Sequence, residues 1–270
     1  MNTEDKHTFV IMGYGESPYL EESYNALKNQ TVKSRIIMTS STPNEYQERF
    51  AERNNIPLII NPNRQGFAGD LNFAYASAST DYVTMVHQDD LLMPEYAEQC
   101  IKYADKYPDT LIVFTDYVEY YNGKMNDESL NMKVKKVLLK THFPFINNLK
   151  SKIAKRSLLS FGNPISCPSI FYIKKNIGDF GFKHEYKVSP EWEALVRLSR
   201  MDGRFVYVKN KLHAYRVHSG QITSVGLEHR KREDKLVFNL LWPKPIASLL
   251  IKFYSYCYSQ VPDAEANDKI

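Results

Sequence analysis

Between residues 8 and 86, short apolar runs alternate with helical patterns, and this alternation constrains the fold more than any other feature of the chain. Strands that alternate with helices are typical of βαβ units, which build a parallel sheet. The expected strands lie at residues 8–12, 35–39, 58–61 and 82–86, and the expected helices at residues 19–29, 44–53 and 67–78. Such sheets bind ligands at the carboxyl ends of their strands, so the loops after these four strands should converge on one cleft.

The rest of the chain continues this pattern less regularly. Pro94 favours the start of another helix, because proline suits the first helical turn. Further strands are expected at residues 111–115, 169–173, 204–208 and 212–216, with a helix at about residues 190–201. The Lys-rich stretch at residues 122–162 is either a mobile loop or helical insertion, or a solvated connector.

The composition allows one sizeable core, because the chain has 270 residues and 43% of them are hydrophobic. A formal net charge of +4 is too small to indicate a nucleic-acid-binding protein, so no nucleic-acid partner is expected. Three scattered cysteines without C-x-x-C spacing argue against a disulfide framework or a zinc site and favour a reducing compartment. The polar N-terminus indicates no signal peptide, and we therefore expect a cytoplasmic protein.

Two adjacent acids follow the apolar run at residues 82–86. The segment His87-Gln88-Asp89-Asp90 puts both carboxylates at the carboxyl end of a buried strand. Hard divalent cations prefer oxygen ligands and neutralise diphosphates, so this pair suits Mg²⁺ or Mn²⁺. The alternative is that Asp89 and Asp90 cap the next turn or helix.

Acids also open the helix expected at residues 190–201, and a histidine follows the strand expected at 212–216. Glu191 and Glu193 lie two positions apart in that helix, so they cannot both face the core. Acids are common in a first helical turn because they interact favourably with the helix dipole, which is the alternative for either residue. His218 is either a metal ligand or an exposed loop residue.

Taken in this order, these segments resemble the family 2 glycosyltransferases with the GT-A fold, and the resemblance covers residues 8–224. The matching segments are residues 11–22, 27–31, 63–72, 87–90, 189–198 and 213–218. Asp89 and Asp90 fall on the last two acids of the family's D-x-D-D pattern, and Glu191 falls on its catalytic base. His218 closes a Tyr-Arg-Val-His segment that matches the family's final motif, whose histidine often assists the metal or the diphosphate.

The resemblance implies an α/β fold of the GT-A type, with a Rossmann-like, mostly parallel nucleotide-binding sheet flanked by helices. Residues 1–225 would form this domain. Its nucleotide-binding half would span about residues 1–116, and its acceptor-binding half about residues 117–225. Residues 226–270 would form a helical, amphipathic C-terminal extension.

The resemblance also implies an inverting, metal-dependent hexosyltransferase. It would transfer a sugar from a nucleotide sugar, with a UDP-sugar expected, to a hydroxyl of a glycan or lipid-linked acceptor in the biosynthesis of a bacterial surface polysaccharide such as a capsule. Mn²⁺ or Mg²⁺ is expected on Asp90, with help from Asp89 and His218, where it stabilises the leaving diphosphate. Glu191 is expected to take a proton from the acceptor hydroxyl as that oxygen attacks the anomeric carbon.

Two departures from the family pattern affect the donor site. His87 stands where the family often has its first aspartate, and residues 38–42 stand where members usually have two acids, one of which recognises the pyrimidine. Thr39 and Ser40 can still hydrogen-bond a uracil edge. Asp70 either substitutes for the missing acid or lies on an exposed helical face.

The remaining site residues are expected on either side of the transferred sugar. Tyr14 either stacks on the base or packs, and Asp89 is expected to contact the nucleotide as well as the metal. Residues 161–169 resemble the stretch that borders the acceptor pocket in the family, and Ser169 and Trp192 are the expected acceptor-binding residues.

The tail from about residue 240 combines aromatic residues with Lys244 and Lys252. Pro243 and Pro245 interrupt it, so it lacks the roughly 20 consecutive apolar residues of a membrane-spanning helix. Its composition suits peripheral contact with the inner face of the plasma membrane, near a lipid-linked acceptor. Packing against the domain or a neighbouring subunit is an equal alternative.

Two other functions compete with sugar transfer. The acids missing at Thr39 and His87 fit a nucleotide- or glycan-binding protein of the same fold that has lost turnover. A metal-dependent transferase of a polyol phosphate or a nucleotidyl group would use the same cleft. The retained metal acids and base favour the glycosyltransferase, and release of a nucleoside diphosphate instead of a monophosphate would separate it from nucleotidyl transfer.

Overall fold

The computed structural model describes residues 3–121, 123–218 and 227–259. The strands are β1 (His7–Gly13), β2 (Arg35–Ser40), β3 (Leu58–Ile60), β4 (Tyr82–His87), β5 (Leu91–Leu92), β6 (Thr110–Tyr121), β7 (Lys124–Asn126), β8 (Asn148–Leu149), β9 (Ile170–Ile173) and β10 (Arg204–Arg216). The helices are α1 (Leu20–Lys28), α2 (Glu45–Asn54), α3 (Gly66–Ser77), α4 (Tyr96–Lys106), α5 (Leu130–His142), α6 (Lys152–Leu158), the 3₁₀ helix η1 (Cys167–Ser169), α7 (Lys174–Ile177), α8 (Pro190–Ser199), α10 (Leu227–Leu241) and α11 (Lys244–Ser259). Every strand and helix expected between residues 8 and 86 is present.

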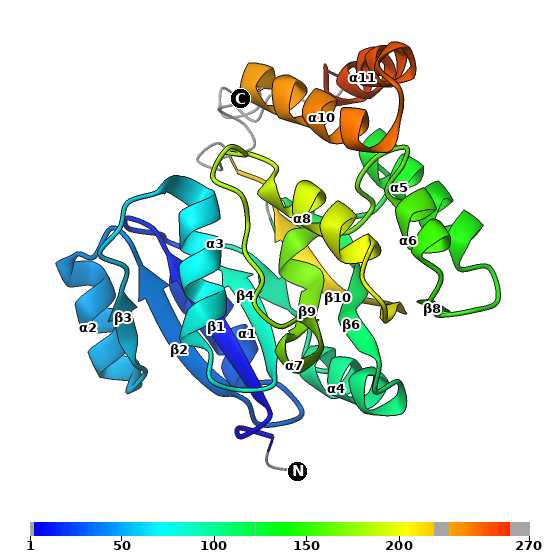
Figure 1. Cartoon of the computed structure of the whole chain (residues 1–270). Coiled ribbons are helices and arrows are strands. Elements are labelled where there is room, and N and C mark those ends of the chain that lie inside the picture. The colour runs from blue at the N-terminus through cyan, green and yellow to red at the C-terminus, as the bar shows by residue number, and fades with distance from the viewer. Residues whose placement is uncertain (1–2, 122, 219–226, 260–270) are drawn as a thin grey trace.

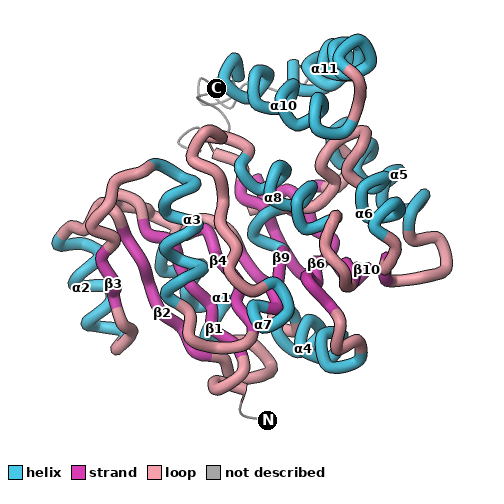
Figure 2. Tube along the Cα trace, viewed as in Figure 1, coloured by secondary structure: helices cyan, strands magenta, loops and turns pink. Residues whose placement is uncertain are grey.

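The strands form one sheet in the order β3-β2-β1-β4-β9-β6-β10-β5, with β7 paired to β6 and β8 paired to β10. The strands β3, β2, β1 and β4 are parallel, as are β6 and β10. Between these two parallel groups, β9 runs antiparallel to both of its neighbours. Helices flank the sheet (Figures 1 and 2), so the expected α/β architecture is confirmed.

Side chains that alternate along β1 enter two different cores. Val10 and Met12 pack with residues of α3 and α8, whereas Phe9 and Ile11 pack with residues of α1 and α4. Successive side chains of a strand point to opposite faces, so a strand covered on both faces is a continuous apolar run. This explains why β1 carried a clear signal in the sequence.

Two parts of the second half differ from the expected pattern. The strands expected at residues 204–208 and 212–216 are a single strand, β10, whose pairing with β6 is irregular between Val208 and His213. The polar residues 209–211 are exposed there, so a segment typical of a turn is an irregular part of the strand. The stretch at residues 122–162 contains α5, β8 and α6, which is the helical-insertion alternative.

The C-terminal helices α10 and α11 pack onto the rest of the domain. Val237, Phe238 and Ala247 are fully buried in the core cluster that also contains Trp192 of α8, and the Phe238 and Trp192 rings lie 5.0 Å apart. Figure 1 shows both helices beyond α8, at the end of the molecule opposite the N-terminus. The described part of the extension therefore shares the domain core, and the boundary at residue 226 stays a prediction. No helix in the described ranges is both long and apolar enough to span a bilayer.

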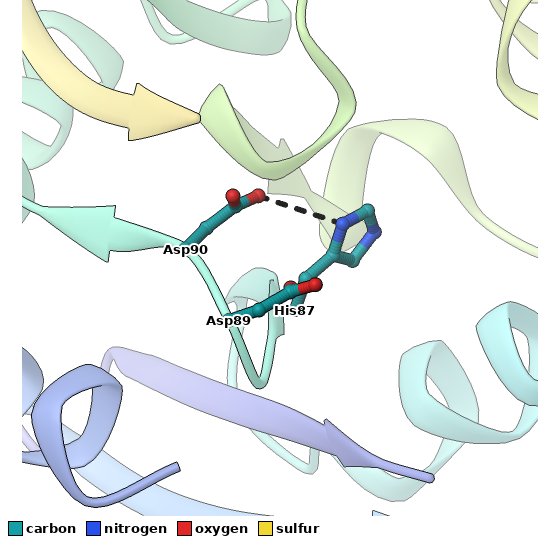
Figure 3. A group of neighbouring side chains, drawn as sticks. All are labelled: His87, Asp89 and Asp90. Atoms are coloured by element: carbon teal, nitrogen blue, oxygen red, sulfur yellow. Dashed lines mark ion pairs between the residues drawn. The ribbon is translucent and has the colours of Figure 1, made fainter. Parts of the chain in front are cut away.

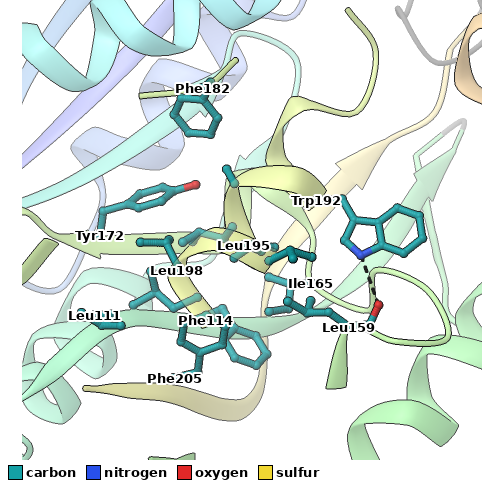
Figure 4. Close-up of a cluster of buried hydrophobic side chains, with 14 of the residues drawn as sticks. Leu111, Phe114, Leu159, Ile165, Tyr172, Phe182, Trp192, Leu195, Leu198 and Phe205 are labelled. Carbon is teal, nitrogen blue, oxygen red and sulfur yellow. Dashed lines mark hydrogen bonds between the residues drawn. The ribbon is translucent and has the colours of Figure 1, made fainter. Parts of the chain in front are cut away.

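Figure 4 shows the core between the sheet and α8. Leu195 and Leu198 of α8 lie among side chains of the strands, including Phe114 and Phe205. Trp192 lies at one edge of this cluster, toward the functional site. The packing fixes the orientation of α8 and hence of the acids in its first turn.

Candidate active site

The loops that follow β1, β2, β3 and β4 meet at one cavity of about 940 Å³, as the alternation of strands and helices predicted. Residues from α3, α5, β6, η1, α8, β10, α10 and α11 also line it. A cavity of this size is typical of small-molecule sites. The loop at residues 219–224, which follows His218, lies outside the described residues.

All five residues predicted to bind the nucleotide line this cavity: Tyr14, Thr39, Ser40, Asp70 and Asp89. The side chain of Tyr14 is 66% exposed after β1, whereas Thr39 and Ser40 are buried at the end of β2. The exposed Tyr14 ring is suited to stack on a nucleobase, and the buried hydroxyls of Thr39 and Ser40 are suited to hydrogen-bond its edge.

Asp70 lies half-buried on α3, next to the end of β3. Its Oδ1 accepts a hydrogen bond from Asn61 Nδ2 at 3.2 Å, and burial raises the pKa of its carboxyl. Arg64 Nε donates to the Ser41 carbonyl oxygen at 3.1 Å and brings a cation to the same wall. Asn61 and Arg64 were not predicted as site residues from the sequence, although Arg64 falls in the segment at residues 63–72 that resembles the family.

Gln88 joins the loops after β1 and β4. Its Oε1 accepts a hydrogen bond from the Tyr14 backbone N–H at 3.0 Å, and its Nε2 donates to the Tyr14 carbonyl oxygen at 2.8 Å. Both bonds fix the backbone of Tyr14 relative to the neighbouring Asp89. No sequence signal identified this role, because a glutamine between polar residues is common in loops.

Asp89 and His218 meet at the surface of the cavity. His218 Nε2 lies 2.9 Å from Asp89 Oδ2, and both residues line the cavity. The two residues are 129 positions apart in the chain, and the ends of β4 and β10 bring them together. This contact joins the two segments that the sequence singled out as separate metal-binding candidates.

Asp90 lies behind this surface and is 1% exposed. Its Oδ1 accepts a hydrogen bond from the Arg216 backbone N–H at 2.8 Å, and its Oδ2 lies 3.2 Å from His213 Nε2 and 3.5 Å from His87 Nδ1. Burial opposes ionisation of Asp90, but His213 and His87 hold its pKa well below its usual range. Asp90 therefore joins β4 to β10, and it does not line the cavity.

The side chains at the end of β4 fit a divalent cation. His87, Asp89 and Asp90 each have a ligand atom, and these atoms lie within 4.8 Å of one another (Figure 3). Among the described residues, His87 Nε2 and Asp90 Oδ2 are buried without a hydrogen-bond partner. Burial disfavours a charged His87, but the carboxylates of Asp90, Asp89 and Glu191 outweigh it and raise its pKa. A bound cation would balance the same negative charge.

Arg216 holds the loop that carries Asp89. Its Nε donates to the Asp89 carbonyl oxygen at 2.7 Å, and its Nη2 donates to Glu22 at 2.6 Å. The guanidinium lies between two rings, 4.4 Å from the centre of Tyr19 and 4.7 Å from that of Tyr120. Arg216 belongs to the Tyr-Arg-Val-His segment that resembles the family's final motif, but the sequence alone indicated no role for it.

Glu191 and Glu193 have different surroundings, as their spacing on α8 predicted. Glu191 is half-buried and lines the cavity. Burial raises the pKa of its carboxyl, against the opposing effects of a backbone hydrogen bond and of the charge of His87. Glu193 is 1% exposed, 2.9 Å from Arg197 Nε and 3.1 Å from Lys183 Nζ. A raised pKa suits a carboxylate that accepts protons near neutral pH.

The two residues predicted to bind the acceptor lie in different places. Trp192 lines the cavity, and its Nε1 donates to the Leu159 carbonyl oxygen at 3.3 Å. Ser169 is fully buried, its hydroxyl donates to the Ser166 carbonyl oxygen at 2.7 Å, and it does not line the cavity. Its neighbours Ser166 and Cys167 do line it.

Comparison with known proteins agrees with this architecture. A model of the family described as glycosyl transferase family 2 matches residues 8–179, well over half of the chain. EpsH of Bacillus subtilis (strain 168) is 20% identical, with 77% of this chain and 71% of EpsH covered.

Two solved structures share the fold. The match to the crystal structure of residues 1–349 of TarS from S. aureus covers 95% of this chain and 72% of the TarS chain, at 13% identity and a TM-score of 0.62. The mannosyltransferase PcManGT from Pyrobaculum calidifontis, in complex with GDP-Man and Mn²⁺, matches 96% of this chain and 70% of its own, at 15% identity and a TM-score of 0.62. At these identities the likeness establishes the fold alone.

Proposed function

The chain belongs to glycosyl transferase family 2, and on that basis we propose that it transfers a sugar from a UDP-sugar to a hydroxyl of a glycan or lipid-linked acceptor, with inversion at the anomeric carbon. One observation supports this most: Asp89, His218 and Glu191, from three distant segments, line a single cavity. TarS has been solved with UDP and with UDP-GlcNAc, which supports a nucleotide-sugar donor.

Asp89, His218 and His87 present ligand atoms at the cavity, and Asp90 Oδ2 lies directly behind them. These residues would hold Mn²⁺ or Mg²⁺, and the Mn²⁺ complex of PcManGT supports this choice. When bound, the ion supplies positive charge that stabilises the leaving diphosphate. Arg216 keeps the backbone of Asp89 in place, so the carboxylate is oriented before the donor arrives.

The donor base is proposed to lie between Tyr14 and the end of β2. The exposed Tyr14 ring stacks on the base, and Thr39, Ser40 and the half-buried Asp70 bond its edge. Asp70 would replace the acid that other family members have after the second strand. Its carboxylate can accept a hydrogen bond from the ring N–H of uracil.

Glu191 is the proposed general base. Its carboxylate takes the proton of the acceptor hydroxyl while that oxygen attacks the anomeric carbon from the face opposite the diphosphate, which inverts the configuration. Trp192, next to it in α8 and also in the cavity lining, is 2% exposed and its ring packs against Phe238 and Tyr254, so it would shape the cavity wall on the acceptor side instead of stacking on the sugar. Ser169 would act only through the turn that it stabilises.

The proposed setting is the inner face of a bacterial plasma membrane, where the enzyme would build a surface polysaccharide such as a capsule. The Lys-bearing C-terminal helices support peripheral membrane contact, because basic and apolar side chains together favour anionic lipid surfaces.

A screen of nucleotide sugars with Mn²⁺ and a set of glycan acceptors tests the function. We expect release of UDP together with a glycosylated product. Binding without turnover would instead identify a nucleotide-binding relic of the fold, and release of UMP would identify a nucleotidyl or polyol-phosphate transferase.

A further inference from the structure

A second, smaller cavity of about 240 Å³ adjoins the main one. It lies between α5, α11 and residues 161–163, and four residues line both cavities: Asn131, Lys135, Asn163 and Tyr254. The smaller cavity therefore borders the cavity that Glu191 lines. We call it the α5–α11 groove.

The α5–α11 groove is apolar. Its other lining side chains include Val134, Val137, Leu138, Phe161, Leu250 and Phe253. Val137 is 62% exposed and Phe253 67% exposed, which is a large exposed fraction for apolar side chains that face a cavity. Such a surface gains free energy when a hydrocarbon covers it.

Exposed apolar side chains are concentrated around this groove. Residues 130–162 and 244–254, which supply most of its lining, hold nine of the thirteen large apolar side chains that are exposed among the described residues, and three of the nine line the groove: Val137, Phe161 and Phe253. In Figure 1 α11 lies next to α5 at the upper right of the view, and α6 lies beside α5. A concentration of this kind marks an interaction surface, because single exposed apolar residues would be scattered.

The same two stretches are strongly basic. They contain ten lysines and arginines and no acid. Some of these cations pair with acids of other segments, such as Lys133 with Glu128 and Lys136 with Asp127. Lys140 of α5 and Lys244 and Lys252 of α11 are exposed on the two helices that line the groove, so they add positive charge to this part of the surface. An apolar groove with a basic rim matches a lipid that carries an anionic headgroup.

Lys135 stands where the groove meets the main cavity. Its Nζ donates to the Tyr117 hydroxyl at 2.7 Å and lies 5.0 Å from the centre of that ring. Burial, with the nearby charge of Arg230, lowers the pKa of Lys135 to about 8. A second anion beside Lys135, added to Glu119, would favour its charged form.

We propose that the acceptor is a lipid phosphate, with its hydrocarbon chain in the α5–α11 groove, its phosphate at Lys135 and its glycan in the main cavity that Glu191 lines. This proposal rests on the proposed function for the identity of the main cavity. It deepens that function by naming the chemical class of the acceptor. It also gives α11 a role in the site, since Leu250, Phe253 and Tyr254 of that helix complete the groove.

Vesicle flotation tests the proposal with three lipid compositions. Phosphatidylcholine vesicles contain a polyprenyl phosphate, the uncharged polyprenol, or phosphatidylglycerol, each at the same mole fraction. The variants are Val137→Asp in the groove and Lys135→Met at the junction, with Ile60→Asp on the exposed strand β3 as the control. Phe253→Ser on α11 serves as a second groove variant if Val137→Asp does not fold.

The wild type should bind vesicles with polyprenyl phosphate more tightly than vesicles with polyprenol or with phosphatidylglycerol. The groove variant should weaken this binding by about tenfold or more, which is the loss expected for one buried apolar side chain. Lys135→Met should reduce the preference over polyprenol by about fivefold, and Ile60→Asp should bind as the wild type does. Equal binding to phosphatidylglycerol and polyprenyl phosphate, or a groove variant that binds like Ile60→Asp, would overturn the proposal.

UDP affinity in the presence of Mn²⁺, measured by calorimetry on the same preparations, separates this proposal from the function on which it rests. Retained lipid binding without UDP binding would overturn the proposed donor and leave the lipid groove in place. Retained UDP binding without a preference for polyprenyl phosphate would overturn the lipid-phosphate proposal and leave the proposed donor in place.

Discussion

The carboxylate of Glu233 in α10 accepts a hydrogen bond from the backbone N–H of Ser189, at 2.9 Å and two residues before Glu191. The same carboxylate also accepts from the N–H groups of Lys187 and Val188, at 2.8 and 2.9 Å. Glu233 is only 4% exposed, so these bonds are shielded from water. The C-terminal extension thus fixes the segment from which the proposed base projects.

Glu233→Gln should therefore slow transfer without weakening donor binding. The amide keeps one acceptor oxygen but turns its N–H₂ group toward backbone donors, which costs about 1–3 kcal/mol of unfolding free energy. Single-turnover rates, UDP affinity and thermal unfolding measure the three effects. The exposed Lys235→Gln on the same helix is the matched control. Equal turnover in both variants would show that Glu233 has no role in positioning Glu191.

Removal of divalent metal should abolish most UDP binding, because Asp89 without a counter-ion repels a diphosphate. Asp89→Asn and His218→Ala should weaken Mn²⁺-dependent UDP binding while the proteins remain folded, since both side chains are at the cavity surface. Calorimetry with Mn²⁺ and with EDTA measures this. Equal UDP affinity in the two buffers would contradict the metal site.

Asp90→Asn should behave differently from Asp89→Asn. Asp90 is buried between the Arg216 backbone and His213, so its loss should lower the free energy of unfolding by about 1–3 kcal/mol in addition to any effect on metal binding. Urea unfolding of the two variants compares them. If Asp90→Asn is as stable as the wild type, Asp90 does not join β4 to β10 as described.

The pH dependence of turnover should report Glu191. Burial raises the pKa of its carboxyl above the ordinary value of 4.5, and a base must be deprotonated to accept a proton. The single-turnover rate should therefore fall as the pH drops through that raised pKa, with a midpoint above 4.5. The residual activity of Glu191→Gln should lack this acid limb. An unchanged acid limb in the variant would assign it to another group.

The fold of the first half was predictable because local and global signals agree there. The run at β1 is buried on both faces, and Gln88 and Asp89, which follow β4, face the cavity. Since the carboxyl ends of these strands share one edge, the meeting of Asp89 with the loop after β1 followed from topology alone. The nearness of His218 followed from the resemblance, which put its motif at the same site.

The roles of Glu233 and Arg216 were not predictable, because each depends on partners in distant segments. The bonds of Glu233 are to backbone N–H groups, which leave no trace in the residue types of residues 187–189. Arg216 gains its role from the rings of Tyr19 and Tyr120 and from a backbone carbonyl. Sequence reasoning finds donors and acceptors of side chains more readily than those of the backbone.

The sequence pattern also predicted the helices α5 and α6 only weakly, and the positions of their apolar residues explain why. Apolar side chains such as Val137 and Ile153 are exposed there, 62% and 81%, so the apolar residues do not follow one buried helical face. At Val137 the α5–α11 groove accounts for the exposure, because this side chain lines the groove; nothing in the structure explains the exposure of Ile153.

The central claim, that Glu191 is the base of a glycosyltransferase, is tested most directly by comparing Glu191→Gln with Glu193→Gln. Glu191→Gln should keep donor affinity while single-turnover transfer falls by roughly 10²- to 10⁴-fold, the contribution of a positioned base. Glu193→Gln should lose stability, because Glu193 is buried beside Arg197 and Lys183, but its folded fraction should transfer sugar at nearly the normal rate. Normal transfer by Glu191→Gln, or a catalytic loss confined to Glu193→Gln, would contradict the account.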